Sequence, residues 1–193
     1  GVTALDVAAY KKETHAFESL GAFKYIWPLQ LAAGGQTMPL NTTPMDADMF
    51  PILGISPLMG RVFTRQEVEQ DEQVVVLSYS VWKNALHGDP GILGQKITLN
   101  RSPYIVIGVM PRGFSFPPEP GHEADSTEIW IPLHLTPAEL KDPGWNGIEM
   151  VGRLKPGMTA AQAQADANRV ERETKRGYSA RMTTLHISSV VRS

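Results

Sequence analysis

The alternation of hydrophobic and polar residues predicts many short strands and a few helices. Short runs rich in branched and aromatic residues indicate strands, and in chain order they cover 23–31, 36–43, 73–77, 96–99, 104–109, 129–133 and 148–154. The first two runs flank Gly34-Gly35, and 96–99 and 104–109 flank Asn100–Pro103, so each pair predicts a β-hairpin. Pro28 indicates an edge strand or a bulge, and a last strand is expected within 182–191.

Apolar residues at helical spacing predict the helices. One is expected from Leu5 to Phe17, with Leu20 on the same face and Gly21 as its stop. Short helical pieces are expected at 46–53, broken near Pro51 and closed by Gly54, and at 78–86.

The clearest helix is predicted at 160–175. Thr159 precedes it as the N-cap, and Gln162 completes a capping box. Small and mildly apolar residues recur on one face of this helix and predict its buried side: Ala163, Ala167, Val170 and Thr174.

Composition narrows the class of protein. The chain has 193 residues, 42% hydrophobic and 20% charged, with a formal net charge of −2, so it has the make-up of a globular protein and no basic excess for nucleic acid. The absence of cysteine excludes disulfides and thiolate metal sites. No apolar run reaches the ~20 residues of a membrane span, and we expect no signal peptide at the start.

The stretch HGDPGILGQKITLN, from His87 to Asn100, resembles a phosphate-binding loop. A P-loop needs four residues between its glycines, a lysine directly after the second, and a helix behind it. Here Gly88 and Gly94 are separated by five residues, Gln95 takes the lysine position, and a strand is predicted next. We therefore expect a structural loop and no nucleotide site.

Other candidate chemistry is weak. The best metal-ligand set is His122-Glu123-Ala124-Asp125, for which a solvated acidic loop is the alternative. Ser56 fails as a nucleophile because proline follows it in GISPL. We expect no catalytic, cofactor-binding or metal-binding residue and no cofactor.

Two further groups of side chains have structural explanations. The acidic residues near position 70 could do acid–base work, but are typical of a solvated face: Glu67, Glu69, Asp71 and Glu72. Of the tryptophans Trp27, Trp82, Trp130 and Trp145, the first three are expected in the core, and Trp145 is the one that suits a partner contact. Arg61 is expected to bind carbonyls or a carboxylate of its own lobe.

Several sequence blocks together resemble the MacB-like periplasmic core domain of ABC transporter permeases, and most closely the type whose permease half is duplicated. The blocks read F-x-x-L-G-x-x-P-x-x-G-R-x-F, V-x-V-L-S, W, G-D-P, G-x-x-I-x-L-N, V-I-G-V-M-P and R-L-K-P-G. They occur in that order at Phe50–Phe63, Val74–Ser78, Trp82, Gly88–Pro90, Gly94–Asn100, Val106–Pro111 and Arg153–Gly157.

The resemblance implies an α+β fold with two lobes. A porter-like α/β sandwich lobe would be built from both chain ends, 1–46 and 118–193, and a smaller mixed α/β lobe, 47–117, would be inserted in the middle. Alternate strand residues would form the core of the inserted lobe: Val74, Val76, Ile97, Leu99, Ile105, Ile107 and Val109.

The resemblance also implies a function. It indicates a non-catalytic domain on the periplasmic face of the bacterial inner membrane, inserted between transmembrane helices of a permease. The implied partners are those helices, a second permease copy or half and, indirectly, a cytoplasmic ATP-binding subunit. A periplasmic adaptor is allowed, and no nucleic acid is expected. Movement driven by ATP outside the domain would be transmitted to export or efflux work. A periplasmic solute- or glycan-binding module is the alternative, and a hydrolase using the His122 loop is the enzymatic rival.

Overall fold

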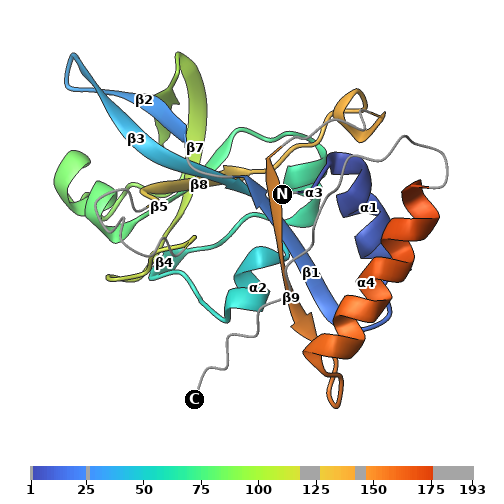
Figure 1. The fold of residues 1–193 in the computed structure, drawn as a ribbon. Coiled ribbons are helices and arrows are strands. Elements are labelled where there is room, and N and C mark those ends of the chain that lie inside the picture. Colours follow the sequence, from blue (N-terminus) through green and yellow to red (C-terminus); the bar gives the residue numbers. More distant parts are fainter. Residues whose placement is uncertain (1, 25–26, 118–126, 142–146, 176–193) are drawn as a thin grey trace. The chain divides into compact units, whose positions relative to one another are not determined.

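The computed structural model describes residues 2–24, 27–117, 127–141 and 147–175 of the chain (Figure 1). The fold is α+β, as the resemblance implies. The chain divides into two compact units: unit 1 consists of Gly1–Ala22 and Leu135–Ser193, and unit 2 is Phe23–His134.

Unit 1 combines two helices with two strands. Its elements are α1 (Ala4–Glu13), β1 (Phe17–Lys24, which runs on into unit 2 after Ala22), the short 3-10 helix η3 (Glu139–Lys141), β9 (Ile148–Leu154) and α4 (Ala160–Lys175). β1 and β9 are neighbours in the sheet, and α1 lies against α4 (Figure 1).

The predicted helix α4 is confirmed over its full length. The Thr159 hydroxyl accepts the Gln162 amide N–H at 3.2 Å, and the Gln162 side chain accepts the Thr159 N–H at 2.8 Å, which is the capping box. Ala163, Ala167 and Val170 are buried, so the small-residue stripe forms the packed face of this helix.

The expected helix from Leu5 to Phe17 is only partly correct. α1 begins after Thr3, which forms a capping box with Asp6, and it ends at Glu13. Phe17 to Lys24 is a strand instead. Phe17 and Leu20 are three residues apart and mimic a helical face, but both side chains pack over Gly152 of β9, where a Cβ would lie 2.6–2.7 Å from them.

Unit 2 is a small closed barrel. Its strands are β2 (Trp27–Ala33), β3 (Gln36–Met45), β5 (Val74–Leu77), β6 (Lys96–Leu99), β7 (Ser102–Val109) and β8 (Ile129–Pro132). They pair in the order β2-β6-β7-β5-β8-β3, and β3 pairs back with β2. This closure leaves few unpaired strand edges. The hairpins β2–β3 and β6–β7 are both confirmed.

Shorter elements surround the barrel. They are α2 (Met49–Leu53), β4 (Met59–Gly60), which pairs with β7, α3 (Arg65–Glu69) and a π-helical turn η1 (Val81–Ala85). Gly54 ends α2 with φ +65°, as predicted. Pro51 does not break this helix, because it lies in the first turn, where no backbone donor is required.

The barrel core contains side chains from all six strands, with Val81 and Ile92 added from the connecting segments. Its members are Leu31, Leu40, Val75, Leu77, Val81, Ile92, Ile97, Leu99, Val106, Val109 and Ile129.

Strict alternation predicts part of this core. Ile97, Leu99 and Val109 are in it. Val74, Val76 and Ile107 are buried but are not members of this cluster. Ile105 is 39% exposed, so its assignment to the core is wrong. β7 shifts its register against β5 between Val75 and Val76. The irregularity changes the parity of β7, and Val106 and Val109 therefore both face the core.

The domain boundaries expected from the sequence differ from the two units. Unit 2 extends from 23 to 134 rather than from 47 to 117, and it is the larger unit and not the smaller one. The reason is that β2, β3 and β8, which were assigned to the lobe at the chain ends, complete the barrel.

Candidate functional site

The glycine-rich stretch from Gly88 to Thr98 is built around a carboxylate. Asp89 accepts the Gly91 N–H at 2.8 Å and the Gln95 side-chain N–H at 2.9 Å, and the Trp82 indole donates to the Asp89 carbonyl at 2.9 Å. Lys96 then begins the strand β6. A phosphate would meet the negative charge of Asp89 and no helix N-terminus, so the predicted failure as a P-loop has a structural cause.

Arg61 pairs with a carboxylate of unit 2, as the sequence predicts. Its guanidinium donates to both carboxylate oxygens of Glu67, at 2.8 and 2.6 Å. The hydrogen bond from Arg61 is the main cause that lowers the pKa of Glu67, with a further contribution from Thr64, while burial opposes it. Glu67 also caps α3 through Thr64. This pair therefore fixes the start of α3 and has no catalytic geometry.

The other acidic residues of this stretch are solvated. Glu69, Asp71 and Glu72 are exposed, as expected for them, whereas Glu67 is half-buried and paired. Across the described ranges, no group of three or more His, Asp or Glu side chains is placed to hold a metal ion. The His122 loop and Trp145 lie outside the described residues, as does the expected strand at 182–191.

The remaining candidates have structural roles or lie open to solvent. Trp130 is fully buried and donates to the Phe116 carbonyl at 3.1 Å. Trp82 is half-buried against the barrel core. Ser56 is exposed in the segment between α2 and β4.

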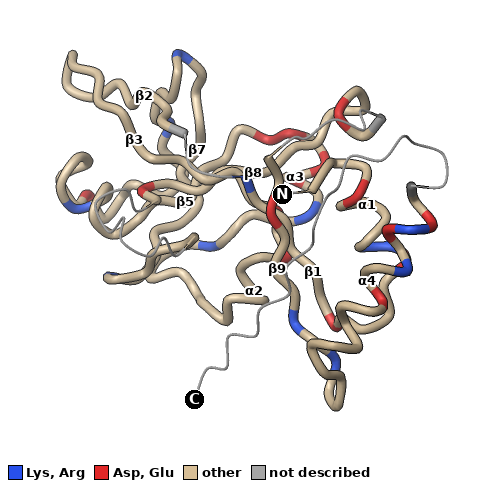
Figure 2. The backbone as a smooth tube through the Cα atoms, viewed as in Figure 1, with Lys and Arg blue, Asp and Glu red and all other residues tan. Residues whose placement is uncertain are grey.

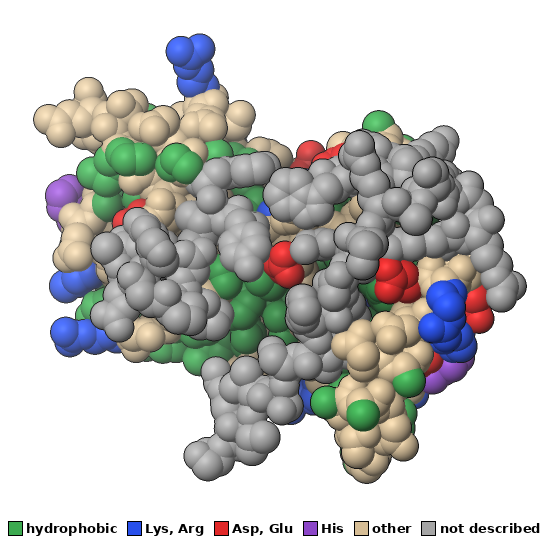
Figure 3. All heavy atoms as spheres, in the orientation of Figure 1, with side chains coloured by type: hydrophobic (Ala, Val, Ile, Leu, Met, Phe, Trp, Pro, Cys, Tyr) green, Lys and Arg blue, Asp and Glu red, His purple; other side chains and the backbone are tan. Residues whose placement is uncertain are grey.

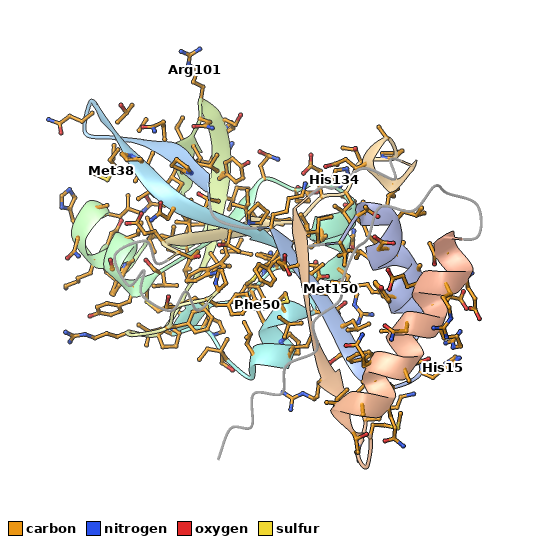
Figure 4. All side chains as sticks on the ribbon, in the orientation of Figure 1. His15, Met38, Phe50, Arg101, His134 and Met150 are labelled. Carbon is orange, nitrogen blue, oxygen red and sulfur yellow. The ribbon has the colours of Figure 1, made fainter. Side chains whose placement is uncertain are left out.

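Unit 1 contains a tightly bonded joint between the end of α1 and the helix α4, which we call the α1–α4 joint and define as Glu13, His15, Ala16, Asp166 and Arg169. One oxygen of Asp166 accepts the backbone N–H groups of His15 and Ala16, at 2.5 and 2.9 Å. The Arg169 guanidinium donates to the Glu13 carbonyl at 2.6 Å and to Asp166 at 2.8 Å. Figure 4 shows His15 beside α4. These bonds fix the connection between α1 and β1 against α4.

The electrostatics of the joint favour the ionised Asp166. Burial opposes ionisation, but the hydrogen bonds from Arg169, His15 and Ala16 outweigh it and hold the pKa of Asp166 below its usual value. Arg169 also bonds Glu173 at 3.0 Å. The sequence does not predict this joint. Its only local signal is an acid and an arginine three residues apart on a helix, and the backbone partners lie about 150 positions away.

Comparison with known proteins places the chain in a family. The profile of the MacB-like periplasmic core domain matches residues 2–170. The macrolide export ATP-binding/permease protein MacB of Salmonella typhi is 24% identical over 143 residues, which are 74% of this chain and 21% of that protein. MacB of Neisseria gonorrhoeae is 32% identical over 89 residues, covering 42% of this chain and 14% of that protein. The chain thus spans about a fifth or less of the length of these relatives.

Solved structures share the fold. The periplasmic region of MacB from Actinobacillus actinomycetemcomitans superposes with a TM-score of 0.68 at 19% identity, covering 90% of this chain and 74% of that one. The extracellular domain of the noncanonic ABC-type transporter YknZ from Gram-positive bacteria gives 0.65 at 13% identity, covering 89% and 82%.

The fold and the profile match define the class of protein as a periplasmic domain of a MacB-like ABC transporter permease. The chain belongs to the MacB-like periplasmic core domain family. None of the helices within the described residues is both long and apolar enough to cross a membrane.

Proposed function

We propose that this domain is non-catalytic and couples cytoplasmic ATP binding and hydrolysis to periplasmic export or efflux by mechanotransmission. The observation that supports it best is the make-up of unit 1, which is formed from the two ends of the chain. In a permease, transmembrane helices on either side of the domain would connect to this one unit. Movement of those helices would then act on unit 1 at both connections.

The α1–α4 joint suits this role. Arg169 binds the carbonyl of Glu13, the last residue of α1, and Asp166 binds the N–H of Ala16 in the segment between α1 and β1, so α1 and α4 are fastened by hydrogen bonds as well as by packing. Hydrogen bonds to charged groups are stronger than those between neutral groups. A force applied near the start of the chain would therefore be carried to α4 with little local deformation.

The proposed partners are the transmembrane helices of the same permease, a second permease copy or half and, indirectly, a cytoplasmic ATP-binding subunit. We place the domain on the periplasmic face of the bacterial inner membrane, where a periplasmic adaptor could engage it. The transported substrate would be handled outside the cytoplasm.

The test uses the full-length permease with its ATP-binding subunit, in a transport assay run alongside ATP hydrolysis. Arg169→Ala should reduce the amount of substrate exported per ATP hydrolysed. Arg172→Ala is the matched control, because Arg172 is an exposed arginine on the same helix and should leave the ratio unchanged.

A second pair of variants separates a mechanical domain from an enzyme. Alanine at His122 or Glu123 should leave transport intact, because the proposal assigns no chemistry to that loop. Loss of transport in a folded and abundant His122→Ala or Glu123→Ala protein would contradict the proposal and indicate a site there.

A further inference from the structure

The chain passes between its two units twice. The first passage lies inside the strand β1, between Ala22 of unit 1 and Phe23 of unit 2, and the second lies between His134 of unit 2 and Leu135 of unit 1. Unit 2 is therefore joined to unit 1 at two points of the backbone. The bonds on either side of these two points determine which movements the connection allows.

Both passages are fixed in unit 2 to the same residue, Met45 at the end of β3. Phe23 of β1 pairs with Met45, and the N–H of Leu133, directly after β8, donates to the Met45 carbonyl at 2.9 Å. The strand order β8-β3-β1 places Met45 between the other two residues, and all three are buried. Because neighbouring strands are about 5 Å apart, Phe23 and Leu133 lie about 10 Å from each other.

Aromatic packing also ties the entering strand to the leaving strand. The Phe23 ring meets the Phe116 ring edge-on, with 5.0 Å between the ring centroids. The Phe116 carbonyl accepts the indole N–H of Trp130, a buried residue of β8, at 3.1 Å. We call this group the β3 anchor and define it as Phe23, Met45, Phe116, Trp130 and Leu133. It holds the two strands at a fixed spacing within unit 2.

The second passage leaves one residue between two fixed ends. On the unit 2 side, His134 Nδ1 donates to the Val68 carbonyl at 3.2 Å. On the unit 1 side, the Glu139 carboxylate accepts the Thr136 N–H at 2.9 Å, and the Glu139 N–H donates to the Thr136 hydroxyl at 3.2 Å. Leu135 alone lies between these two sets of bonds, so its backbone absorbs any change of direction there.

The first passage lies where β1 changes its pairing partner. In unit 1, β1 runs beside β9, and the carbonyl of Ala16, directly before β1, accepts the Lys155 N–H at 3.0 Å. In unit 2, Phe23 pairs with β3 instead. Gly21 and Ala22 stand just before this change, and glycine adopts a wider range of φ and ψ than other residues. The first passage can therefore also bend within one or two residues.

We propose that the two passages form a hinge about which unit 2 swings as a rigid barrel. A body that is joined at two points can rotate only about the line through both points. This line crosses β3 at Met45, because Phe23 and Leu133 lie on either side of it. Hinges in proteins are a few loop or element-terminal residues that absorb changes in φ and ψ, and residues 21–22 and 135 fit that description.

The hinge defines which movements of unit 1 reach unit 2. A rotation of unit 1 about the hinge line is absorbed at the passages, whereas a translation or a twist about another axis is carried into the barrel by the β3 anchor. This consequence for transport rests on the proposed function. The hinge itself does not, because it is a property of the 193-residue chain and is measured without nucleotide, membrane or a second permease copy.

The strand β3 provides the scale of the swing. Gln36, at the far end of β3, lies nine positions before Met45 and about 30 Å from it. Ala47, two positions after Met45, lies at most about 7 Å from it. A swing of about 15°, the size of an established subunit rotation, moves position 36 by about 8 Å and position 47 by about 2 Å. β3 carries no charged residue (Figure 2), so a label at Gln36 displaces no ion pair.

Pulsed electron paramagnetic resonance on the 193-residue chain tests the hinge. A spin label at Arg172→Cys on α4 is combined with a second label at Gln36→Cys or at Ala47→Cys. The distance distribution should be at least about twice as wide for Gln36 as for Ala47, because displacement grows with distance from the hinge line. A second set with Lys12→Cys on α1 as the reference detects swings that leave the first distances unchanged. Two narrow distributions in both sets would show a rigid connection, and two equally wide ones would show that no fixed line exists; either result overturns the hinge and leaves the transport proposal standing.

The β3 anchor is tested by adding Phe23→Leu to the pair Arg172→Cys and Ala47→Cys. Loss of the ring contact should loosen the entering strand, and the distribution should widen toward that found with Gln36. Phe63→Leu is the matched control, because Phe63 is buried and meets Phe50 of α2 edge-on at the same centroid distance of 5.0 Å. Figure 3 shows hydrophobic side chains gathered at the place of α2, and the control should leave the width unchanged. Circular dichroism checks that both variants fold, and equal widths in two folded variants would contradict the anchor.

Discussion

Substituting leucine for Ala167 should destabilise unit 1 by overpacking. Ala167 is 1% exposed, and Ala163 and Val170 on the same face are also buried. α4 packs against α1, so the three additional carbons of leucine have no open space to enter. Inserting methylenes into a packed core costs about 1–3 kcal/mol.

The matched control is Ala165→Leu. Ala165 lies on the exposed side of the same helix, and alanine and leucine have similar helix propensities, so this change should alter the free energy of unfolding by less than about 0.5 kcal/mol. Urea unfolding monitored by circular dichroism measures the free energy of unfolding of both variants. With an m-value of about 2 kcal/mol/M, a loss of about 2 kcal/mol lowers the midpoint by about 1 M.

Equal urea midpoints and equal m-values for Ala167→Leu and Ala165→Leu would contradict overpacking at position 167. That result would mean that α4 moves away from α1 at little cost, and a helix that yields so readily is a poor transmitter of force.

Three further predictions concern the acid range, the glycines and nucleotides. The pKa of Asp166 is lower in the folded state than in the unfolded chain. Its contribution to stability is therefore present above the unfolded pKa of about 4 and is lost as pH falls through the lower folded value. In Asp166→Asn, the free energy of unfolding should fall less steeply between pH 5 and pH 2 than in the unsubstituted chain. Gly60→Ala should cost about 2–4 kcal/mol by urea unfolding, because the new Cβ would lie 2.2 Å from the Ile107 carbonyl oxygen at φ +71°, where strain and overpacking add. Gly94→Ala, which has φ +82° but open space, should cost only the strain of about 1–2 kcal/mol, and equal losses in the two variants would argue against the close contact. Calorimetry of the 193-residue chain with ATP should show no micromolar binding, because the Asp89 carboxylate accepts the hydrogen bond of the Gly91 N–H. Micromolar binding of ATP would contradict the structural assignment of that loop.

Local signals in the sequence predict much of the fold. The capping box of Thr159 and Gln162 and the stripe of Ala163 and Ala167 define α4, because capping and helical periodicity depend only on near neighbours. The hairpins were predicted for the same reason, since Gly34-Gly35 marks a turn between two strand-like runs.

The errors arise where distant contacts decide the structure. Phe17 and Leu20 have helical spacing, but β1 forms because these side chains pack over Gly152, more than 130 positions away. The barrel closes through pairings such as β3 with β8, which no local pattern reveals, and the boundaries drawn at 46 and 118 therefore divided it.

The α1–α4 joint could not be predicted for a similar reason. Asp166 and Arg169 form an ordinary helical acid–base pair in the sequence, and their role comes from the backbone groups of Glu13, His15 and Ala16. Any helix-surface pair would look the same without the fold. The expectation that unit 2 lacks a P-loop needed only the spacing of Gly88 and Gly94 and the strand character of the residues that follow.

Mechanotransmission is tested by a distance measurement in the working permease. The 193 residues contain no cysteine, so Arg172→Cys in a full-length permease from which any other cysteine has been removed gives a single spin-label site on the exposed face of α4. Pulsed electron paramagnetic resonance would measure the distance from this label to one on the other copy or half of the full-length permease, without nucleotide and with ATP trapped in the cytoplasmic subunit. Mechanotransmission predicts a distance distribution that shifts when ATP binds. Identical distributions in a permease that hydrolyses ATP and exports substrate would contradict it.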